Sequence, residues 1–312
     1  MEIIYHLESF EIPNAAITVG TFDGVHLGHQ YLISHLVQEA RTRGLCSVVF
    51  TFDPYPQEVF SKDPSHISIL SSQNEKIRKI ESLGVDYLVF FPFSRDFASL
   101  TAEMFIENIL VEKLSLRFLL LGYDHKFGKD QVSEVAVLER YGDQYGFQLS
   151  RLGQKRVSDY NLSSSLIRKK IESGDLLHMK ELLGEYYAVS GSVVYGKQIG
   201  RQIKFPTANI AVDDPRKLIP KVGVYAILIH YNGIVYKGML NIGIRPTLNE
   251  QKPTCSIEAH IFDFNQDIYG KNLQIDFVQR VRDEIRFDSL DDLVLQLNRD
   301  KTACLELLTH ME

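Results

Sequence analysis

The sequence predicts an α/β plus β chain, in which a parallel sheet covered by helices precedes a small antiparallel β-barrel with a terminal helix. Through residue 184, apolar runs typical of buried strands alternate with segments of helical periodicity, which indicates a parallel sheet. Beyond that point, short β-branched and aromatic runs alternate with turns, which favours an antiparallel barrel or sandwich. The length of 312 residues also favours two domains. We therefore predict one domain over residues 1–184 and a second over residues 185–312.

The first domain opens with an apolar, β-branched strand over residues 16–19 and a helix over residues 29–43. Thr101 is placed to cap a later helix. The remaining predictions, in chain order, are a strand over 46–52, a helix over 73–83, a strand over 85–91, a helix over 101–113, a strand over 117–121, a helix over 131–145 and a strand over 147–151. Because ligands of such sheets bind beyond the carboxyl ends of the strands, the residues that follow each strand are the candidates for function.

The second domain is predicted to contain several short strands and a final helix. Asn232 and Gly233 form a strong hairpin signal between two of these strands. The clearest strands cover residues 222–230, 234–241, 255–264 and 273–279. The final helix, over residues 290–311, repeats apolar side chains at Leu293, Leu297, Cys304, Leu305 and Leu308.

The composition is that of an ordinary globular protein, with 45% hydrophobic residues, 24% charged residues and a net charge of −6. This charge argues against a nucleic-acid-binding protein, so anionic substrates must be held by local features. Cys46, Cys255 and Cys304 are scattered and odd in number, which favours a reducing compartment over a disulfide framework. We see no signal peptide and no apolar run long enough to span a bilayer, so we expect a cytoplasmic protein without a membrane partner.

The stretch TVGTFDGVHLGHQ, from Thr18 to Gln30, reads as a strand, a glycine-punctuated loop and the start of a helix. A helix N-terminus beside glycines is a natural site for an anion. His26 and His29 are three residues apart, so on a first helical turn they share one face with that N-terminus. This arrangement suits a phosphate under attack. The alternatives are a metal-binding pair and structural histidines.

The same stretch resembles the HxGH signature of the nucleotidylyltransferase superfamily. Its longer form, G-x-F-D-G-x-H-x-G-H, looks like the FAD synthetase module of bacterial bifunctional riboflavin kinase/FAD synthetases. The resemblance implies a Rossmann-like nucleotidylyltransferase sheet for the first domain and catalytic roles for His26 and His29. The residues that it places at the ATP phosphates in this stretch are Gly20, Phe22, Asp23, Gly24 and Gly28.

Two further loops follow predicted strands and are similar to motifs of the synthetase family. The implied flavin-binding candidates in them are Asp53, Pro54, Tyr123, Asp124 and Phe127. The family usually has histidine where Tyr55 stands, and Phe-Arg where His125 and Lys126 stand. Because lysine cannot make the bidentate contact of arginine, these departures bear on how the flavin is held.

The segment from Asn161 to Arg168 resembles the superfamily motif S-[ST]-T-x-I-R. The resemblance implies that Ser164 and Arg168 hold the β- and γ-phosphates of ATP. Leu166 stands where an arginine is common. Read without the resemblance, the segment is equally well a helix cap followed by a solvated arginine.

Residues 196–209 resemble the riboflavin kinase loop G-x-x-x-G-R-x-x-G-x-P-T-A-N. The resemblance implies that Gly200 and Arg201 bind ATP, and that Thr207 and Asn209 bind Mg²⁺ together with the phosphates of ATP. Hydroxyl and amide oxygens are ligands that hard cations accept. The chain departs from the family at Lys204, where glycine is common.

Glu258 lies on a predicted strand in which Ile257, Ala259 and Ile261 share one face and Ser256, Glu258 and His260 the other. Alternation alone favours an exposed charge. The resemblance instead implies that Glu258 is the general base that takes the proton from the ribityl 5′-hydroxyl.

Together these motifs predict a bifunctional enzyme whose ligands are riboflavin, FMN, FAD and ATP with Mg²⁺. The second domain is expected to phosphorylate riboflavin to FMN, and the first to transfer AMP from ATP to FMN, giving FAD and pyrophosphate. We expect a monomer or weak oligomer. Two alternatives remain at this point: a riboflavin kinase with a degenerate synthetase domain, and a flavin-binding sensor or carrier without turnover.

Overall fold

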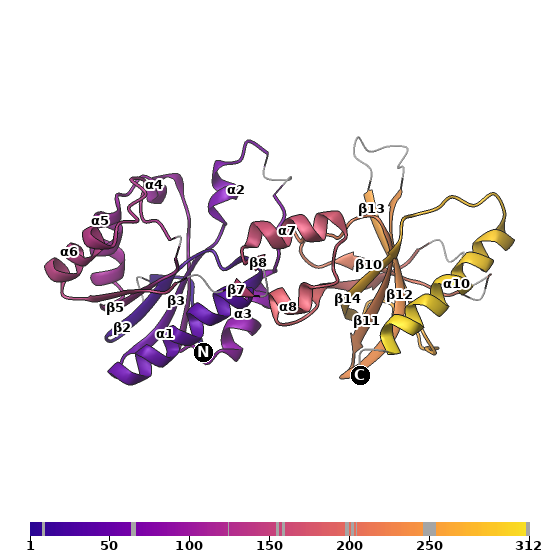
Figure 1. Cartoon of the computed structure of the whole chain (residues 1–312), viewed down its shortest axis with the longest axis horizontal. Helices are drawn as coiled ribbons and strands as arrows, with labels where there is room; N and C mark the ends of the chain where they lie inside the picture. Colours follow the sequence, from indigo (N-terminus) through magenta and orange to yellow (C-terminus); the bar gives the residue numbers. More distant parts are fainter. Residues whose placement is uncertain are drawn as a thin grey trace. The chain divides into compact units, whose positions relative to one another are not determined.

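The chain forms two compact units, Met1–Ser164 and Ser165–Glu312, in a computed structural model (Figure 1). The structure describes residues 1–7, 10–63, 67–123, 125–153, 156–157, 160–196, 200, 203, 205–245 and 254–309. Within the described ranges, every helix is too short or too polar to span a lipid bilayer.

A six-stranded parallel sheet forms the centre of the first unit, as the alternation of strands and helices predicts. Its strand order is β1-β4-β3-β2-β5-β6. The strands are β1 (Glu2–Ile4), β2 (Ala15–Val19), β3 (Cys46–Phe52), β4 (Tyr87–Phe91), β5 (Leu116–Leu121) and β6 (Gln148–Arg151). The chain runs from β2 to β3 and β4 on one side and then crosses to β5 and β6 on the other. The order therefore reverses between β2 and β5, which is where such sheets bind ligands.

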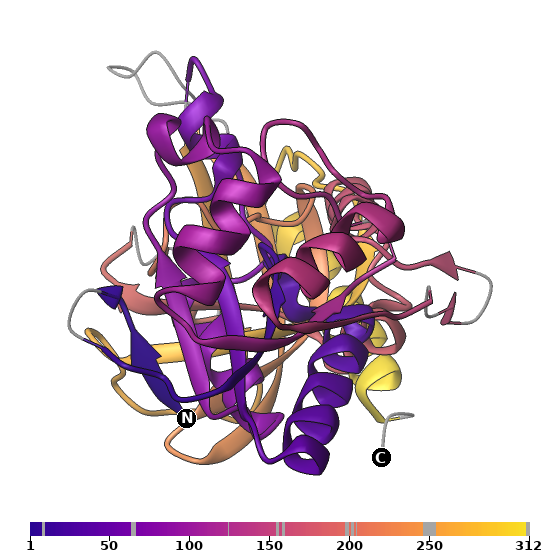
Figure 2. The ribbon, with the colours of Figure 1, turned by 90° about the vertical axis from the view of Figure 1, so that its left-hand side faces the viewer.

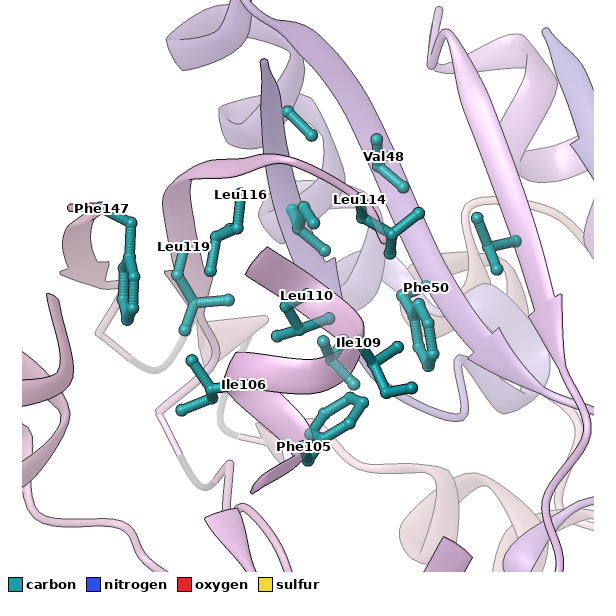
Figure 3. Packing of buried hydrophobic residues seen from close by; sticks show 14 of the residues in the cluster. Val48, Phe50, Phe105, Ile106, Ile109, Leu110, Leu114, Leu116, Leu119 and Phe147 are labelled. Atoms are coloured by element: carbon teal, nitrogen blue, oxygen red, sulfur yellow. The ribbon is translucent and has the colours of Figure 1, made fainter. Parts of the chain in front are cut away.

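Helices cover both faces of this sheet (Figures 1 and 2). All five residues of β2 are buried, because alternate side chains enter opposite layers: Ile17 packs with Ile106 and Leu110, and Ala16 with Leu36 on α1. Figure 3 shows the first of these layers. The helical elements are η2 (Asp23–Val25), α1 (Leu27–Arg43), α2 (Pro56–Phe60), α3 (Gln73–Ser82), α4 (Arg95–Ala98), α5 (Ala102–Phe105), η4 (Ile106–Val111) and α6 (Val135–Tyr145).

Two helices differ from their predicted form. The helix expected over residues 101–113 consists of α5, capped by Thr101 as predicted, and the π-helical turn η4. The helix expected from residue 131 begins only at Val135. Gln131 has a positive φ of 51°, and Phe127 and Val132 exchange two backbone hydrogen bonds of 2.9 Å. These contacts hold the chain in a turn, which hydrophobic periodicity alone does not reveal.

The second unit is a closed antiparallel barrel with strand order β10-β13-β12-β11-β14-β9, as predicted. Its elements are α7 (Ser164–Ser173), α8 (Met179–Leu183), β9 (Tyr187–Val194), β10 (Ala208–Val212), β11 (Gly223–Tyr231), β12 (Ile234–Arg245), β13 (Thr254–Ile261), β14 (Asn272–Arg282) and α10 (Leu290–Thr309), α7 starting at the last residue of the first unit. Cys304 and Leu308 of α10 pack against Ala226, Met239 and Val278 on the outer face of the barrel wall. A short pair of strands, β7 (Arg156–Val157) and β8 (Tyr160–Asn161), precedes α7.

Helices α7 and α8 pack with the barrel. The Lys221 N–H donates to the Ile171 carbonyl of α7 at 3.3 Å, and a side chain at Gly174 would meet Arg280 at 2.6 Å. The pattern of residue contacts thus divides the chain after Ser164, whereas the change in sequence pattern lies at residue 184. The domain limits 1–184 and 185–312 stay a prediction.

We predict that fragments 185–312 and 165–312 both fold, and that the longer one melts at least about 5 °C higher. Residues of α7 and α8 such as Ile171, Met179 and Leu182 are fully buried, and each such side chain contributes roughly 1.5–3 kcal/mol. Thermal unfolding followed by circular dichroism measures the difference. Equal melting temperatures would show that α7 and α8 add nothing to the barrel.

Candidate active sites

The loop after β2 is folded so that His26 caps helix α1. Phe22 and Gly24 have positive φ values of 47° and 80°, which turn the chain sharply between strand and helix. The His26 Nδ1 atom then accepts a hydrogen bond from the His29 backbone N–H at 3.3 Å. Because Nδ1 is an acceptor, the proton of the neutral His26 ring lies on Nε2. The amides of Leu27 and Gly28 follow in the first helical turn, where a helix offers them no acceptor.

The two histidine rings lie against each other, as their spacing predicts. Their centroids are 3.6 Å apart and nearly parallel, and Phe22 packs edge-on against His29. Burial lowers the pKa of His26 from 6.5 to about 4, and burial also holds the pKa of His29 well below 6.5. Neighbouring positive charges reinforce both shifts, from Lys79 on His26 and from Lys76 and Lys79 on His29. Both rings are therefore neutral hydrogen-bonding groups at pH 7. Among the described residues, the buried Nδ1 atom of His29 has no hydrogen-bond partner.

Two lysines of α3, which sequence reasoning missed, hold the carbonyl groups of this loop. Lys76 Nζ donates to the Thr21 carbonyl at 2.7 Å, and Lys79 Nζ donates to the Gly24 carbonyl at 3.0 Å. Lys76 is only 1% exposed. The two lysines are three residues apart on a predicted helix, but nothing in that spacing indicates which loop they reach. They bring two positive charges to a site that suits anions.

Asp23, predicted to contact ATP, anchors the loop from the other direction. Its Oδ1 atom accepts hydrogen bonds from the backbone N–H groups of Leu70, at 2.8 Å, and Ser71, at 3.3 Å. The Ser71 hydroxyl in turn accepts from the Gly24 N–H at 3.0 Å. Of the loop glycines, Gly20 and Gly28 lie against rings: a Cβ would come within 3.0 Å of Phe22 and 3.1 Å of His26, respectively. ATP contacts for these loop residues stay a prediction.

The flavin-binding candidates lie after β3 and β5, on either side of the β2 loop in the sheet order. Asp53 and Pro54 follow β3 directly and are joined by a cis peptide bond. Tyr123 is 42% exposed, whereas Phe127 is 1% exposed and packs near Phe105 in the core. Asp124 lies outside the described residues. The Tyr55 ring, at a departure from the family, covers the Lys76 ammonium at 4.4 Å. Flavin contacts for these residues stay a prediction, and for Phe127 burial makes a packing role the simpler one.

Ser164 is the first residue of α7, as the capping pattern predicts, and its hydroxyl makes a hydrogen bond within the protein. It donates to the Asp23 carbonyl at 2.9 Å, which ties the start of α7 to the histidine loop. Arg168 follows four residues later, on the same side of the helix. Roles for both residues at the phosphates stay a prediction.

In the barrel, strand register brings the predicted catalytic residue and one predicted metal ligand together. Glu258 on β13 pairs with Asn209 on β10, and on its other side with Asn241 on β12. Thr207 lies close by, with its hydroxyl 3.5 Å from Glu258 Oε2. Hydroxyl, amide and carboxylate oxygens thus gather at one place on the barrel wall. Asn241 begins a stretch, residues 241–247, that also resembles the kinase family, but the sequence assigned it no role, because only the register shows that it flanks Glu258.

Thr207 lines two cavities. One, of about 470 Å³, runs from Thr207 along the loop after β13 to Asp267 and Tyr269. The other, of about 280 Å³, lies between the barrel wall and α10, and Glu258 lines it. Its remaining lining residues are mainly apolar and include Ile203, Phe205, Met239, Leu240, Ile285, Phe287, Leu293 and Leu297.

Glycines shape the loop that leads to Thr207. A Cβ at Gly200 would lie 2.2 Å from the Phe205 carbonyl, and one at Gly196 would lie 2.2 Å from Asn209 Nδ2. Gly200 therefore lets the loop close, and Gly196 leaves room for the Asn209 amide. Arg201 and Lys204 lie outside the described residues, and ATP binding by Gly200 and Arg201 stays a prediction.

Two family models match successive parts of the chain. The family model for FAD synthetase matches residues 9–166, and the model for riboflavin kinase matches residues 183–308. The bifunctional riboflavin kinase/FMN adenylyltransferase of Escherichia coli K12 is 36% identical over 304 residues, which cover 97% of this chain and 96% of the relative. The Bacillus subtilis enzyme of the same name is 34% identical over 309 residues, covering 98% and 96%.

The chain belongs to the bifunctional riboflavin kinase/FMN adenylyltransferase family. The resemblance drawn from the HxGH and PTAN motifs is thereby confirmed. A crystal structure of a Streptococcus pneumoniae protein described as a macrolide-efflux protein superposes with a TM-score of 0.88. It is 32% identical in sequence, and the match covers 97% of both chains. Efflux is a statement about that protein; its likeness to this chain concerns the fold.

The buried His26 predicts a loss of stability in acid. Its pKa is lowered in the folded state, so the folded chain binds fewer protons than the unfolded chain. The stabilisation is complete above pH 6.5 and is lost as the pH falls towards 4. Between pH 7 and pH 5, the free energy of unfolding of His26→Asn should fall by about 2 kcal/mol less than that of the unsubstituted chain, because asparagine does not take up a proton in this range. Asparagine can also cap α1, so the variant should keep the start of this helix.

Hydrogen exchange of the β2 and β5 amides in the full chain measures this difference for the first unit alone. His178→Asn, which removes a more exposed histidine beside Glu181, is the control. Equal acid sensitivity of His26→Asn and the unsubstituted chain would contradict the neutral state of His26.

Proposed function

We propose that the barrel phosphorylates riboflavin with MgATP to give FMN, and that the first unit transfers AMP from a second ATP to FMN, giving FAD and pyrophosphate. Membership of the bifunctional family supports both activities. The observation that carries the kinase mechanism is that Thr207 lines both cavities and lies 3.5 Å from the carboxylate of Glu258, which lines the smaller one. We call the place of Thr207 and Glu258 the junction, and we assign the transfer of the phosphoryl group to it.

The two cavities suit different ligands. We assign the apolar cavity under α10 to the flavin ring, because its lining is mainly apolar; the ribityl chain would then extend towards Glu258, which lines the same cavity. The larger cavity adjoins the loop that ends in Thr207, so it fits ATP with its γ-phosphate at the junction. Glu258 then takes the proton from the 5′-hydroxyl as its oxygen attacks the γ-phosphorus, and the bond to ADP breaks.

The residues at the junction fit a hard cation. Thr207 and Asn209 offer a hydroxyl and an amide oxygen beside one carboxylate, which is the donor set that Mg²⁺ shares with nucleotide phosphates. Within the described ranges there is no group of three or more His, Cys, Asp or Glu side chains that would form an all-protein metal site. When bound, Mg²⁺ would neutralise the phosphate charge, while Thr207 and Asn209 orient the phosphates.

The histidine loop supports nucleotidyl transfer without a covalent intermediate. A phosphate oxygen of FMN attacks the α-phosphorus of ATP, and pyrophosphate leaves. The His26 ring presents Nε2–H as a donor, and the first-turn amides of α1 supply further donors at the helix N-terminus. Lys76 and Lys79 hold the loop carbonyls and add positive charge beside His29. Arg168 is assigned to the leaving pyrophosphate, and Ser164 to keeping α7 joined to the loop through Asp23.

Composition supports the remaining parts of the proposal. The net charge of −6 and the three scattered cysteines favour a cytoplasmic enzyme that acts on small molecules, with no nucleic-acid partner and no membrane partner. We assign it as a monomer or weak oligomer.

Single substitutions should separate the two activities. His29→Ala should lower FAD formation from added FMN at least about 100-fold, the scale of losing one preorganised donor, and leave FMN formation unchanged. Glu258→Gln should lower FMN formation about 10²–10⁴-fold by removing a general base, and leave FAD formation from added FMN unchanged. Steady-state assays of each half-reaction measure both effects.

Two matched variants serve as controls. His35→Ala removes another histidine of α1, two turns beyond the loop, and Glu306→Gln removes another carboxylate from the barrel unit. Both should keep both activities. A folded His29→Ala or Glu258→Gln variant that loses the two activities equally would overturn the assignment of one reaction to each unit.

A further inference from the structure

The wall of the apolar cavity carries a polar side chain that the mechanism above does not use. Asn241 on β12 lines the same cavity as Glu258, and the two residues are paired across antiparallel strands. The Cβ atoms of such pairs are about 4.5–5.5 Å apart. Alternation places Asn241 on the same side of β12 as Met239, which faces α10. Asn241 is therefore on the outer, cavity side of the barrel wall.

The register extends this relation into a row of residues around the barrel. Asn209, Glu258, Asn241, Val224 and Arg282 follow one another across β10, β13, β12, β11 and β14. Asn209, on one side of Glu258, lies two residues beyond Thr207, which lines both cavities. Asn241 lies on the other side of Glu258, together with Val224 and Arg282, and all three line the apolar cavity. Glu258 thus has an amide side chain on each neighbouring strand, and of these two amides Asn241 is the one that lines the apolar cavity.

The Asn241 amide lies over Gly243, beside the carboxylate of Glu284. A Cβ built on Gly243 would lie 3.1 Å from Asn241 Nδ2 and 2.6 Å from Glu284 Oε1, so the space above this glycine is shared by the two side chains. Within the described part of the chain, no hydrogen bond of the Asn241 side chain is present. An amide in this position can donate one hydrogen bond and accept another at the same time.

We propose that Asn241 binds a hydroxyl of the ribityl chain next to the one that is phosphorylated, and so sets the 5′-hydroxyl against Glu258. The inference rests on the proposed kinase function of the barrel. A polyol offers both a donor and an acceptor at each hydroxyl, which matches an amide better than a charged or apolar side chain. The apolar lining selects the ring, and Asn241 selects the chain attached to it.

The test compares two flavins in the kinase reaction of the full chain. Riboflavin carries the ribityl chain, whereas lumiflavin has the same ring with a methyl group instead and acts only as an inhibitor. Asn241→Ala should raise the KM for riboflavin about 3- to 10-fold, the range of one lost hydrogen bond, and leave the inhibition constant of lumiflavin and the KM for ATP unchanged. Asn241→Leu keeps a similar side-chain volume and should show the same rise in the KM for riboflavin. It replaces Asn241→Ala if the alanine variant does not fold.

Ser256→Ala is the matched control. Ser256 lies on the same face of β13 as Glu258, but its hydroxyl donates to the Gly243 carbonyl at 3.4 Å and it does not line the cavity. Ser256→Ala should change neither the KM for riboflavin nor the inhibition constant of lumiflavin. An unchanged KM for riboflavin in both Asn241 variants, or an equal weakening of riboflavin and lumiflavin, would overturn the proposal. Failure of the unsubstituted chain to form FMN would instead contradict the kinase function itself.

Discussion

The register between β10, β13 and β12 is the constraint on which the barrel site depends. Successive residues of a strand face opposite sides, so a slip of one residue would turn Glu258 into the barrel and bring Ile257 or Ala259 to the cavity. Ile257 and Ala259 are 4% and 0% exposed, so that slip would also expose core side chains and bury a carboxylate. Closure of the barrel pairs β13 on both edges, which excludes the slip. The same apolar alternation that stabilises the barrel therefore positions Glu258.

The site of the first unit is a loop. Its backbone N–H and C=O groups lack the partners that a helix or strand would supply, so other groups must bind them. Lys76 and Lys79 of α3 donate to carbonyl oxygens of this loop, and the loop's own Asp23 carboxylate accepts from the backbone N–H groups of Leu70 and Ser71, just before α3. The arrangement leaves positive charges beside two neutral histidines, so the site has local positive potential in a chain of net charge −6. Anionic ligands are favoured at this one place, and stability and ligand binding depend on the same contacts.

Most of the helices and strands could be predicted from the sequence, because the local sequence signals agree with the tertiary structure. The strand over residues 46–52 and the cap at Thr101 follow from β-branched runs and from capping chemistry. The differences from the predicted elements have tertiary causes. Helix α6 starts later than predicted because Phe127 pairs with Val132. Strand β1, which was not predicted, forms by pairing with β4 at the edge of the sheet. Motifs located His26, His29 and Glu258, since their spacing is local. They could not locate Lys76, whose partner Thr21 is 55 residues away, and they gave no role to Asn241, which only the register brings to Glu258.

A labelling time course tests the central claim, two successive transfers by two separate sites of one chain, most directly. The purified protein is incubated with riboflavin and either [γ-³²P]ATP or [α-³²P]ATP, and FMN and FAD are resolved over time. The account predicts that γ-label appears first in FMN and then in FAD, whereas α-label appears in FAD and never in FMN. In the [γ-³²P]ATP incubation, absence of label from FMN would contradict the kinase site. Labelled FMN that never becomes FAD, with the first unit folded, would contradict the synthetase site.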